Sequence, residues 1–549
     1  MKDDPDKVYM LGFVDLESKD GGKTFHNILK ENENVHVDNH AMWVNPNHAG
    51  YLVIGNDGGV NITYDGGDHW IKCNNPPVGQ LVSVNYDMET PYNIYGGFQD
   101  NGVWMGPSNY KPDAAWHQTG QYPFKPILDG DGMQVAVDTR GNNIVYTGFQ
   151  FGNYFKVNTA TDATTSITPK HELGERPYRW NWNSPVWLSP HNQDIVYFGS
   201  NKLWRALNEG KDFKVISPDL TRGGKKGDVP YGTITTIHES PLKFGLIYAG
   251  TDDGSIWMTR DGGEEWKKIS DALPQNQWVS RVWSSNFKEG RVYASLNGYR
   301  WDNFNAYLYV SEDYGATWNK IGISLPHEPV NVVKEDPVNE NILFTGTDAG
   351  AYVSLDRGKT FMAFTNGLPR VAVHDLCIHP RDHELILGTH GRSIYIASVK
   401  ELELLHDSIM QKPLYVFNPE KKIYRDSWGK KDFNWDSIKG PEIKIPVWMS
   451  SAGKISVSVF ADSSLELRQF SIDGVKGLNY VKYDLSIDSA FKSSYLDYLN
   501  KDLKKDEDKV KIKPGDNKIY YLRPGKYHIV TEANGAKQER TLIIDKPSG

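Results

Sequence analysis

The sequence has only two cysteines, Cys73 and Cys377, among its 549 residues. This number excludes a disulfide-rich scaffold and a thiolate zinc site, and we expect two separate buried thiols, with one long-range bridge as the alternative. No apolar run approaches the roughly 18 residues that a membrane-spanning helix needs. The motifs HExxH and GxSxG and any cluster of cysteine and histidine are also missing, so we expect neither a cofactor nor a metal.

Basic residues are fewer than acidic residues. Lysine and arginine number 61 against 69 aspartate and glutamate residues, a net charge of −8, and the basic residues form no block. Nucleic-acid-binding proteins need a basic patch, so we do not expect nucleic acid as a partner. The first ten residues, MKDDPDKVYM, are acidic and polar and contain no secretory signal.

Turn residues and aromatic residues, by contrast, are plentiful. The chain has 51 glycines and 29 prolines, together with 17 tryptophans, 30 tyrosines and 20 phenylalanines. Many turns between short runs of β-forming residues are typical of an all-β protein. The aromatic content excludes a disordered chain.

A short signature repeats along the first four hundred residues: Ser or Thr, any residue, Asp, any residue, Gly, any two residues, and an aromatic. Its aspartate can accept hydrogen bonds from backbone N–H groups of its own loop, and its glycine supplies a positive φ. We therefore expect a structural rather than a catalytic role for these aspartates. The five good copies lie at 18–25, 63–70, 259–266, 311–318 and 354–361, and their aspartates are Asp20, Asp65, Asp261, Asp313 and Asp356.

Nine strand–turn–strand segments recur with a period of roughly 42 to 52 residues. This period is the length of one four-stranded blade, so the sequence predicts a β-propeller. We expect a seven-bladed propeller over residues 91–399, and residues 1–90 as the last two blades of a preceding propeller. The chain would then be a C-terminal fragment, and a single ring of eight to ten blades is the alternative. After a linker at 400–435, short alternating strands predict a β-sandwich over 436–549.

The repeated signature is identified as the Asp box, or BNR repeat, of sialidases, sortilin/Vps10-type receptors and xyloglucanase-type glycoside hydrolases. Segments such as GGFQDNGVW (96–104), YGTITTIHESP (231–241) and GTHGRSIYI (388–396) resemble one bacterial family of sortilin-N-terminal-like proteins, often labelled "glycosyl hydrolase". The resemblance implies tandem propellers with a C-terminal sandwich, and an exported location that is periplasmic, cell-surface or secreted. The Arg-Ile-Pro motif of sialidases is absent, which argues against that activity.

If the four strands of a blade are lettered A to D in chain order, the Asp box joins strands C and D. Function is expected on the opposite face, in the B–C loops and in the D–A loops between blades, where the repeat is broken. Tryptophan and tyrosine there suit stacking on sugars, and arginine suits carboxylates or peptide termini. Our candidate ligand-binding residues are Gln99, Asn101, Arg176, Arg179, Trp180, Trp182, Tyr299, Arg300, Trp301, His390 and Arg392. Asp129, Asp252, Asp253, Asp348 and His374 are further candidates in the same loops.

Several of these candidates also have a purely structural interpretation. The segments QDNG, TDDG and TDAG are good β-turn sequences, and the tryptophans of NWN can fill the space between blades. His374 can equally satisfy hydrogen bonds of the core or of a turn. Each candidate therefore needs its geometry before a role can be assigned.

Three functions remain open from the sequence. The first is an exported binding protein that presents its channel face to a peptide or a glycan, with a cell-surface protein as a further partner. The second is a glycoside hydrolase, which needs two carboxylates about 5 to 10 Å apart; Asp100, Asp131 and Asp302 are the candidates. The third is a scaffold subunit of a surface assembly.

Overall fold

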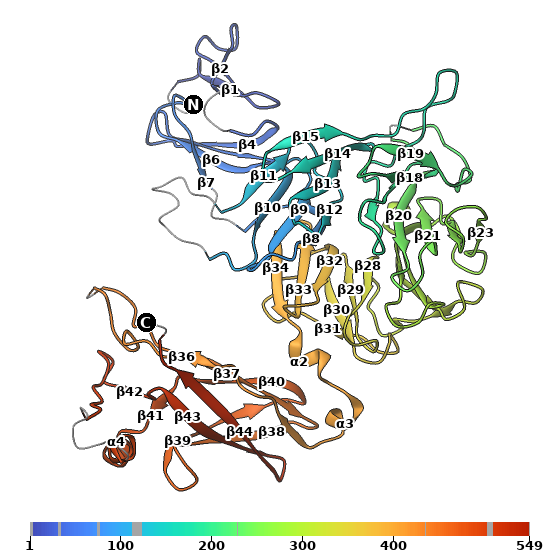
Figure 1. Cartoon of the computed structure of the whole chain (residues 1–549). Helices are drawn as coiled ribbons and strands as arrows, with labels where there is room; N and C mark the ends of the chain where they lie inside the picture. The colour runs from blue at the N-terminus through green and yellow to red at the C-terminus, as the bar shows by residue number, and fades with distance from the viewer. Residues whose placement is uncertain are drawn as a thin grey trace. The chain divides into compact units, whose positions relative to one another are not determined.

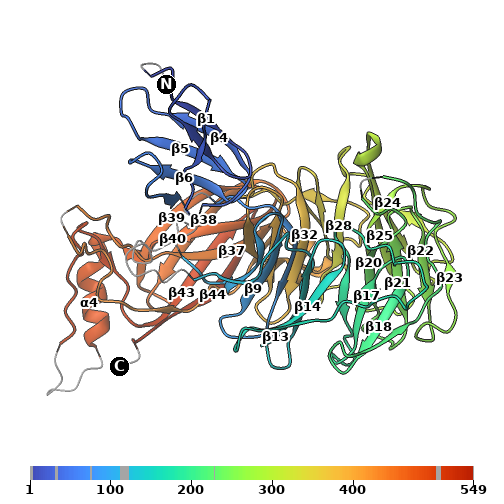
Figure 2. The same cartoon turned by 90° about the horizontal axis from the view of Figure 1, so that it is seen from above.

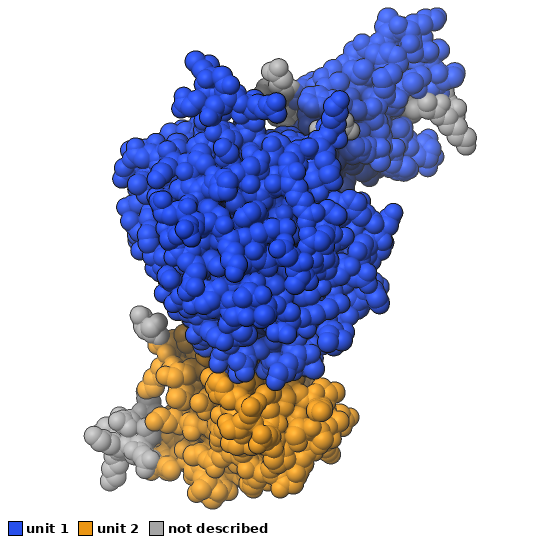
Figure 3. Space-filling model, turned by 90° about the vertical axis from the view of Figure 1, so that its right-hand side faces the viewer, with its two compact units in different colours: residues 1–399 blue, residues 400–549 orange. Residues whose placement is uncertain are grey.

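A computed structural model describes residues 4–30, 35–73, 77–111, 123–227, 229–433, 435–501 and 509–547. The chain divides into two compact units, residues 1–399 and 400–549, which Figure 3 colours separately. Both units are built almost wholly from antiparallel β-strands. This confirms the all-β prediction of a propeller followed by a sandwich.

Seven consecutive sheets in the described part of the first unit form a ring (Figure 1). In each sheet the strands pair in chain order, because each run of β-branched and aromatic residues returns on the previous one through a short Gly/Asp turn. The first four sheets are β8 (Leu81–Tyr86), β9 (Asn93–Phe98), β10 (Gly102–Pro107) and β11 (Lys125–Leu128); β12 (Ala136–Asp138), β13 (Ile144–Phe149), β14 (Asn153–Asn158) and β15 (Ala163–Ser166); β16 (Val186–Leu188), β17 (Val196–Gly199), β18 (Leu203–Leu207) and β19 (Asp212–Val215); and β20 (Ile234–Glu239), β21 (Ile247–Thr251), β22 (Ile256–Thr259) and β23 (Lys267–Lys268).

The last three sheets of the ring follow the same order. They are β24 (Trp278–Ser284), β25 (Val292–Gly298), β26 (Asn303–Ser311) and β27 (Asn319–Lys320), with the 3-10 turn η1 (Tyr299–Trp301) between β25 and β26; β28 (Val330–Glu335), β29 (Leu343–Thr347), β30 (Gly350–Ser354) and β31 (Met362–Ala363); and β32 (Val373–His379), β33 (Glu384–Thr389) and β34 (Ile394–Ser398).

The ring closes between its first and last sheets. Leu81 and Val84 of β8 share one buried cluster with Cys377 and Ile386 of the last sheet, and the Val84 N–H donates a 3.2 Å hydrogen bond to Asp375 Oδ2. The ring therefore begins at β8, ten residues before the expected boundary at residue 91. The expected boundary follows the turn signal of the β9–β10 hairpin, and the inner strand LVSVNY that precedes the hairpin has no such signal.

Two further sheets precede the ring within the first unit. They are β1 (Val8–Met10), β2 (Leu16–Ser18) and β3 (His26–Asn27), and then β4 (Asn39–Val44), β5 (Leu52–Asn56), β6 (Gly59–Thr63) and β7 (Ile71–Cys73). They pack on each other through a separate small core that contains Ile28, Leu52, Ile54 and Trp70. Figure 2 shows these sheets to one side of the ring. Both cysteines are free thiols, with Cys377 buried and Cys73 half-buried.

The second unit is a β-sandwich. Its strands alternate buried and exposed side chains, as in β38, where Ile455, Val457 and Val459 have no exposed surface. One sheet contains β35 (Leu414–Val416), β37 (Ile443–Met449) and β40 (Gly477–Tyr483); the other contains β36 (Lys422–Ile423), β44 (Ala536–Asp545), β43 (Gly525–Ala533), β38 (Gly453–Phe460) and β39 (Glu466–Gly474); β41 (Ser486–Ile487) pairs with β42 (Tyr520–Tyr521).

The segment expected as a linker, 400–435, belongs partly to this sandwich. Its β35 pairs with β37 and its β36 pairs with β44, because LYV and KI extend the exposed edges of the two sheets. The helices are short: α2 (Lys400–Glu403), α3 (Asp407–Met410), the 3-10 turn η2 (Ser489–Phe491) and α4 (Lys492–Asn500). Among the described residues we find no helix of the length and apolarity that crossing a membrane requires.

Candidate functional site

The five Asp boxes share one hydrogen-bond pattern. The hydroxyl of the Ser or Thr two residues earlier donates to the aspartate at 2.7–2.8 Å, and the backbone N–H four residues later donates at 2.8–3.1 Å. In Asp313 these bonds, the side-chain bond from Thr317 first, lower the pKa of the carboxyl. The Asp-box carboxylates are thus engaged in holding their own loops.

Asp100, in the β9–β10 turn, and Asp131, in the loop after β11, lie together at the strand ends of the first ring sheet. The Asp100 N–H donates a 2.8 Å hydrogen bond to Asp131 Oδ1, and Asp100 itself has a left-handed backbone, with φ of 62°. Desolvation, a hydrogen bond shared with Asp131 and the charges of Asp131 and Asp57 raise the pKa of Asp100 to about 6. The Asp131 carboxylate is thus engaged by the backbone of the β9–β10 turn.

Residues from the sheets that precede the ring complete this cluster. His36 Nε2 lies 2.7 Å from the Asp100 carbonyl oxygen, and Asn101 Nδ2 donates a 2.8 Å bond to the Asp57 carbonyl oxygen. Sequence reasoning missed His36 and Asp57. Asp57 could have been found from the sequence, because NDGG at 56–59 forms the same turn of its repeat as QDNG at 99–102, which contains Asp100.

Asp302 lies apart from that pair. It ends the η1 turn between β25 and β26, in the fifth sheet of the ring, whereas Asp100 follows β9 in the first sheet. The Asp302 side chain is exposed, and its backbone N–H bonds to Tyr299 O at 3.1 Å. No described contact links it to Asp100 or Asp131, so the structure brings together two of the three candidate carboxylates.

The η1 loop carries an aromatic platform with one arginine. The Arg300 guanidinium lies 4.0 Å from the ring centroid of Trp278 and 4.5 Å from that of Tyr299. Tyr299 and Trp301 are 40% and 44% exposed, far more than most aromatic side chains of the ring. Stacking of this kind fixes the guanidinium while leaving its N–H groups for an acceptor. Trp278, at the start of β24, is a platform member that sequence reasoning did not name.

A group of polar side chains lies near Arg300 at the same end of the ring. The rings of His374 and His390 are stacked with centroids 4.2 Å apart. Burial, then the charges of His390 and Arg300, lower the pKa of His374 to about 3. Burial raises the pKa of Asp348, against the opposing effects of Asn331 and Arg300. We call Tyr299, Arg300, Trp301, Asp348, His374 and His390 the channel-mouth cluster.

Other candidate residues are engaged in holding the fold. Arg179 donates to Gly232 O at 3.0 Å and forms a 2.7 Å ion pair with Asp219. Trp180 packs edge-on against Tyr154, with centroids 5.7 Å apart. Asp252 accepts from the N–H groups of Gly232 and Thr233, and Asp253 accepts from Arg222, Thr251 and Ser255.

The remaining candidates are placed as follows. Arg176 and Arg392 are exposed. The Trp182 carbonyl accepts a 3.2 Å bond from the Phe151 N–H, and the Gln99 N–H donates a 2.9 Å bond to Gln80 O. These backbone bonds assign no ligand role to either side chain.

The inner strands carry a buried charge cluster that sequence reasoning missed. Arg281 Nη2 lies 2.9 Å and Lys334 Nζ 3.4 Å from the same Asp375 oxygen. The ring of His238 contacts those of Trp187 and Trp283 in tilted arrangements, with centroid distances of 4.5 and 4.1 Å. Arg281, Lys334 and Asp375 lie on strands β24, β28 and β32. Side chains of a strand alternate between its two faces, and the sequence does not indicate which alternate set faces inward.

The described residues contain no group of three or more His, Cys, Asp or Glu side chains placed to hold a metal ion. The candidate site consists of the channel-mouth cluster and, near the junction with the preceding sheets, the Asp100–Asp131 pair. Its chemistry is that of aromatic stacking and hydrogen bonding around one cation.

Comparison with known proteins gives partial matches. A model of the sortilin/Vps10 family (sortilin, neurotensin receptor 3) matches residues 306–408. A xyloglucanase of Hypocrea jecorina is 31% identical over 155 residues, which are 25% of this chain and 18% of that protein. Rat sortilin is 20% identical over 175 residues, 24% of this chain and 20% of sortilin. The match thus spans about a fifth of the length of these relatives.

The repeated Asp boxes, the ring of four-stranded sheets and these matches agree with one another. The chain is an Asp-box (BNR) β-propeller protein related to the xyloglucanase-like and sortilin/Vps10 proteins.

Proposed function

We propose that this chain is a ligand-binding propeller of an exported protein and that the channel-mouth cluster takes a peptide or a glycan. The observation that carries the proposal is the stacking of Arg300 on Trp278 and Tyr299, at 4.0 and 4.5 Å from the ring centroids. This arrangement offers a flat apolar surface and an adjoining N–H donor. Such a pair suits a sugar ring with its hydroxyl groups, or a peptide side chain with a carboxylate.

The neighbouring groups support binding rather than proton transfer. The low pKa of His374 keeps its imidazole neutral at physiological pH, so it offers a hydrogen bond without a charge. Asp348 has a second role as the counter-charge of Arg300, since each lies close enough to shift the pKa of the other. An aromatic platform with fixed hydrogen-bonding groups beside it is typical of recognition.

The relatives bear on the location and on the second candidate function. Sortilin and a vacuolar protein sorting/targeting protein are among them, and together with the xyloglucanases they support an extracellular or secretory-pathway location for this chain. Hydrolysis of a glycan is favoured by the match to the xyloglucanase of Hypocrea jecorina and by the Asp100 pKa of about 6, which suits a general acid. The bond from the Asp100 N–H to the Asp131 carboxylate weighs against it, because it engages one of the two carboxylates in holding a loop.

Titration of the full chain with soluble glycans and with acidic peptides, followed by calorimetry, tests the binding proposal. We expect Arg300→Ala and Trp301→Ala to weaken the bound ligand's affinity at least about tenfold. The matched controls are Arg540→Ala, which removes an arginine stacked on Tyr415 in the sandwich, and Trp43→Ala, which removes an equally exposed tryptophan. A ligand that binds all four variants with wild-type affinity would place the site elsewhere.

A further inference from the structure

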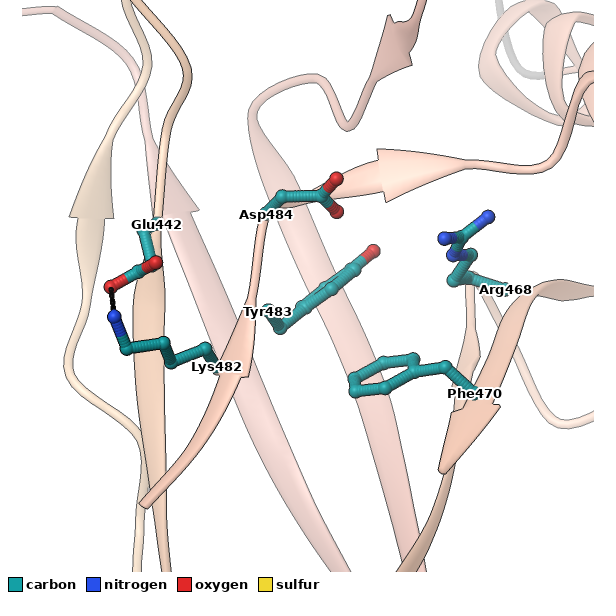
Figure 4. Close-up of a pocket in the computed structure, with 6 residues that line it drawn as sticks. All are labelled: Glu442, Arg468, Phe470, Lys482, Tyr483 and Asp484. Atoms are coloured by element: carbon teal, nitrogen blue, oxygen red, sulfur yellow. Dashed lines mark ion pairs between the residues drawn. The ribbon is translucent and has the colours of Figure 1, made fainter. Parts of the chain in front are cut away.

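The sandwich contains a pocket of its own. It has a volume of about 260 Å³ and lies where the edge strand β39 of one sheet faces the edge strand β40 of the other (Figure 4). In the described part of the chain, β39 pairs with β38 alone and β40 with β37 alone. The pocket is lined by Glu442, Arg468, Phe470, Lys482, Tyr483 and Asp484.

Two aromatic rings form the apolar part of this pocket. Phe470 and Tyr483 are stacked with centroids 5.5 Å apart and an interplanar angle of 23°. Tyr483 is buried, and its hydroxyl donates a 2.7 Å bond to Ser486 O, which fixes the ring. Phe470 is half-buried and packs on the sandwich core. The rings therefore form a rigid apolar surface that reaches solvent at Phe470.

Charged side chains stand on both sides of these rings (Figure 4). Arg468 is anchored by its ion pair with Asp488 and keeps 34% of its side chain exposed. On the other side, Lys482 pairs with Glu442 at 3.4 Å. Asp484 accepts two bonds from Ser486, both at Oδ1 and neither at Oδ2. The pocket thus offers fixed donors and acceptors around an aromatic ring.

The charges of the lining residues cancel, since Arg468 and Lys482 balance Glu442 and Asp484. A pocket with no net charge favours a neutral ligand over an anion or a cation. Its volume lies just below the range of about 300–1,000 Å³ found for drug-sized ligands, which suits one or two rings. We propose that this pocket binds a neutral pyranose unit of a glycan, stacked on Phe470 with its hydroxyls bonded to Arg468 and Asp484.

This proposal concerns a site separate from the channel-mouth cluster, and the test keeps the two apart. The full chain carrying Arg300→Ala is titrated by calorimetry with xyloglucan heptasaccharide and cellohexaose as neutral probes and with trigalacturonate as an anionic probe. Phe470→Ala and Asp484→Asn are then added singly. The matched control is Asp462→Asn, because Asp462 accepts from Ser464 and Leu465 in a similar turn and does not line the pocket.

We expect a neutral probe to bind the Arg300→Ala chain. Phe470→Ala or Asp484→Asn should weaken it about tenfold, with Asp462→Asn unchanged and every variant folded at the assay temperature. Loss of all binding in Arg300→Ala alone would locate the sugar on the propeller and overturn the proposal. The proposal would also be overturned if both pocket variants bound the neutral probe as tightly as the Arg300→Ala chain does. Stronger binding of trigalacturonate than of either neutral probe would overturn it as well.

Discussion

The backbone N–H of Asp100 donates a 2.8 Å hydrogen bond to the carboxylate of Asp131, two residues that lie 31 positions apart in the chain. The bond joins the β9–β10 turn to the loop that enters the next sheet. It engages the Asp131 carboxylate with backbone, and the negative charge of Asp131 contributes to the raised pKa of Asp100. The pair is therefore better suited to holding the two loops together than to cleaving a glycosidic bond.

Asp100→Asn should make the protein more stable at neutral pH. The folded-state pKa of Asp100, about 6, lies above its ordinary value of 3.8. Between these values the native state binds more protons than the unfolded state, so the free energy of unfolding falls as pH rises from about 4 to 6. Asparagine tolerates the left-handed backbone at this position and carries no charge. Melting temperatures at pH 4 and pH 7.5 check this: the gain should appear at pH 7.5 and shrink at pH 4.

Asp375→Asn should be strongly destabilising. It leaves Arg281 and Lys334 buried without their shared counter-charge, and breaking a buried ion pair in this way costs about 3–5 kcal/mol. Denaturant unfolding followed by tryptophan fluorescence measures the loss. Asp382→Asn, at a carboxyl that is 35% exposed, is the control and should change little. Near-equal unfolding midpoints for the two variants would show that the inner charge cluster contributes little to stability.

Asp356→Ala should loosen one Asp box. It removes the acceptor of the Ser354 hydroxyl and of both the N–H and the hydroxyl of Thr360, and we expect a loss of about 1–2 kcal/mol. Asp271→Ala removes an aspartate with 80% exposure and one surface ion pair, and it serves as the control. Hydrogen exchange at residues 354–361 checks the prediction. Protection of this loop that is unchanged in Asp356→Ala would contradict the structural role of the box.

Arg300→Lys should separate stacking from charge. Lysine keeps the positive charge but loses the planar face that lies on Trp278 and Tyr299, so ligand affinity should fall nearly as far as in Arg300→Ala. Calorimetry with the ligand found for the wild type measures both variants. Full affinity in Arg300→Lys would mean that the cluster recognises charge alone.

The repeat architecture could be predicted because five copies of one turn signature and the regular spacing of the strand–turn–strand segments mark the blades. Asp20, Asp261 and Asp356 stand in the same eight-residue pattern, and the periodic Gly and aromatic positions fix the strand order within each sheet. The start of the ring could not be placed as well, since the inner strand Leu81–Tyr86 carries no turn signature of its own. For the same reason the sequence predicts a linker where the short strands Leu414–Val416 and Lys422–Ile423 lie.

The candidate site depends on side-chain contacts between different strands and loops, which a single sequence does not encode. The expansion of the loop at Tyr299–Asp302 made it visible as a departure from the repeat. The stacking of His374 on His390, and of Arg300 on Trp278, joins residues that are distant in the chain or lie on different strands. Arg179 and Trp180 look equally suited to a ligand in sequence, and only their bonds to Asp219, Gly232 and Tyr154 reveal a structural use.

The choice between capture and cleavage of a glycan is tested most directly by one experiment. The full chain is incubated with xyloglucan, and mass spectrometry of the soluble sugars is run beside calorimetry on the same sample. We predict that no shortened product of xyloglucan is released by the wild type or by Asp131→Asn, and that any heat measured comes from binding of the intact polymer. Shortened oligosaccharides released by the wild type and abolished in both Asp100→Asn and Asp131→Asn would contradict a binding function and establish a hydrolase.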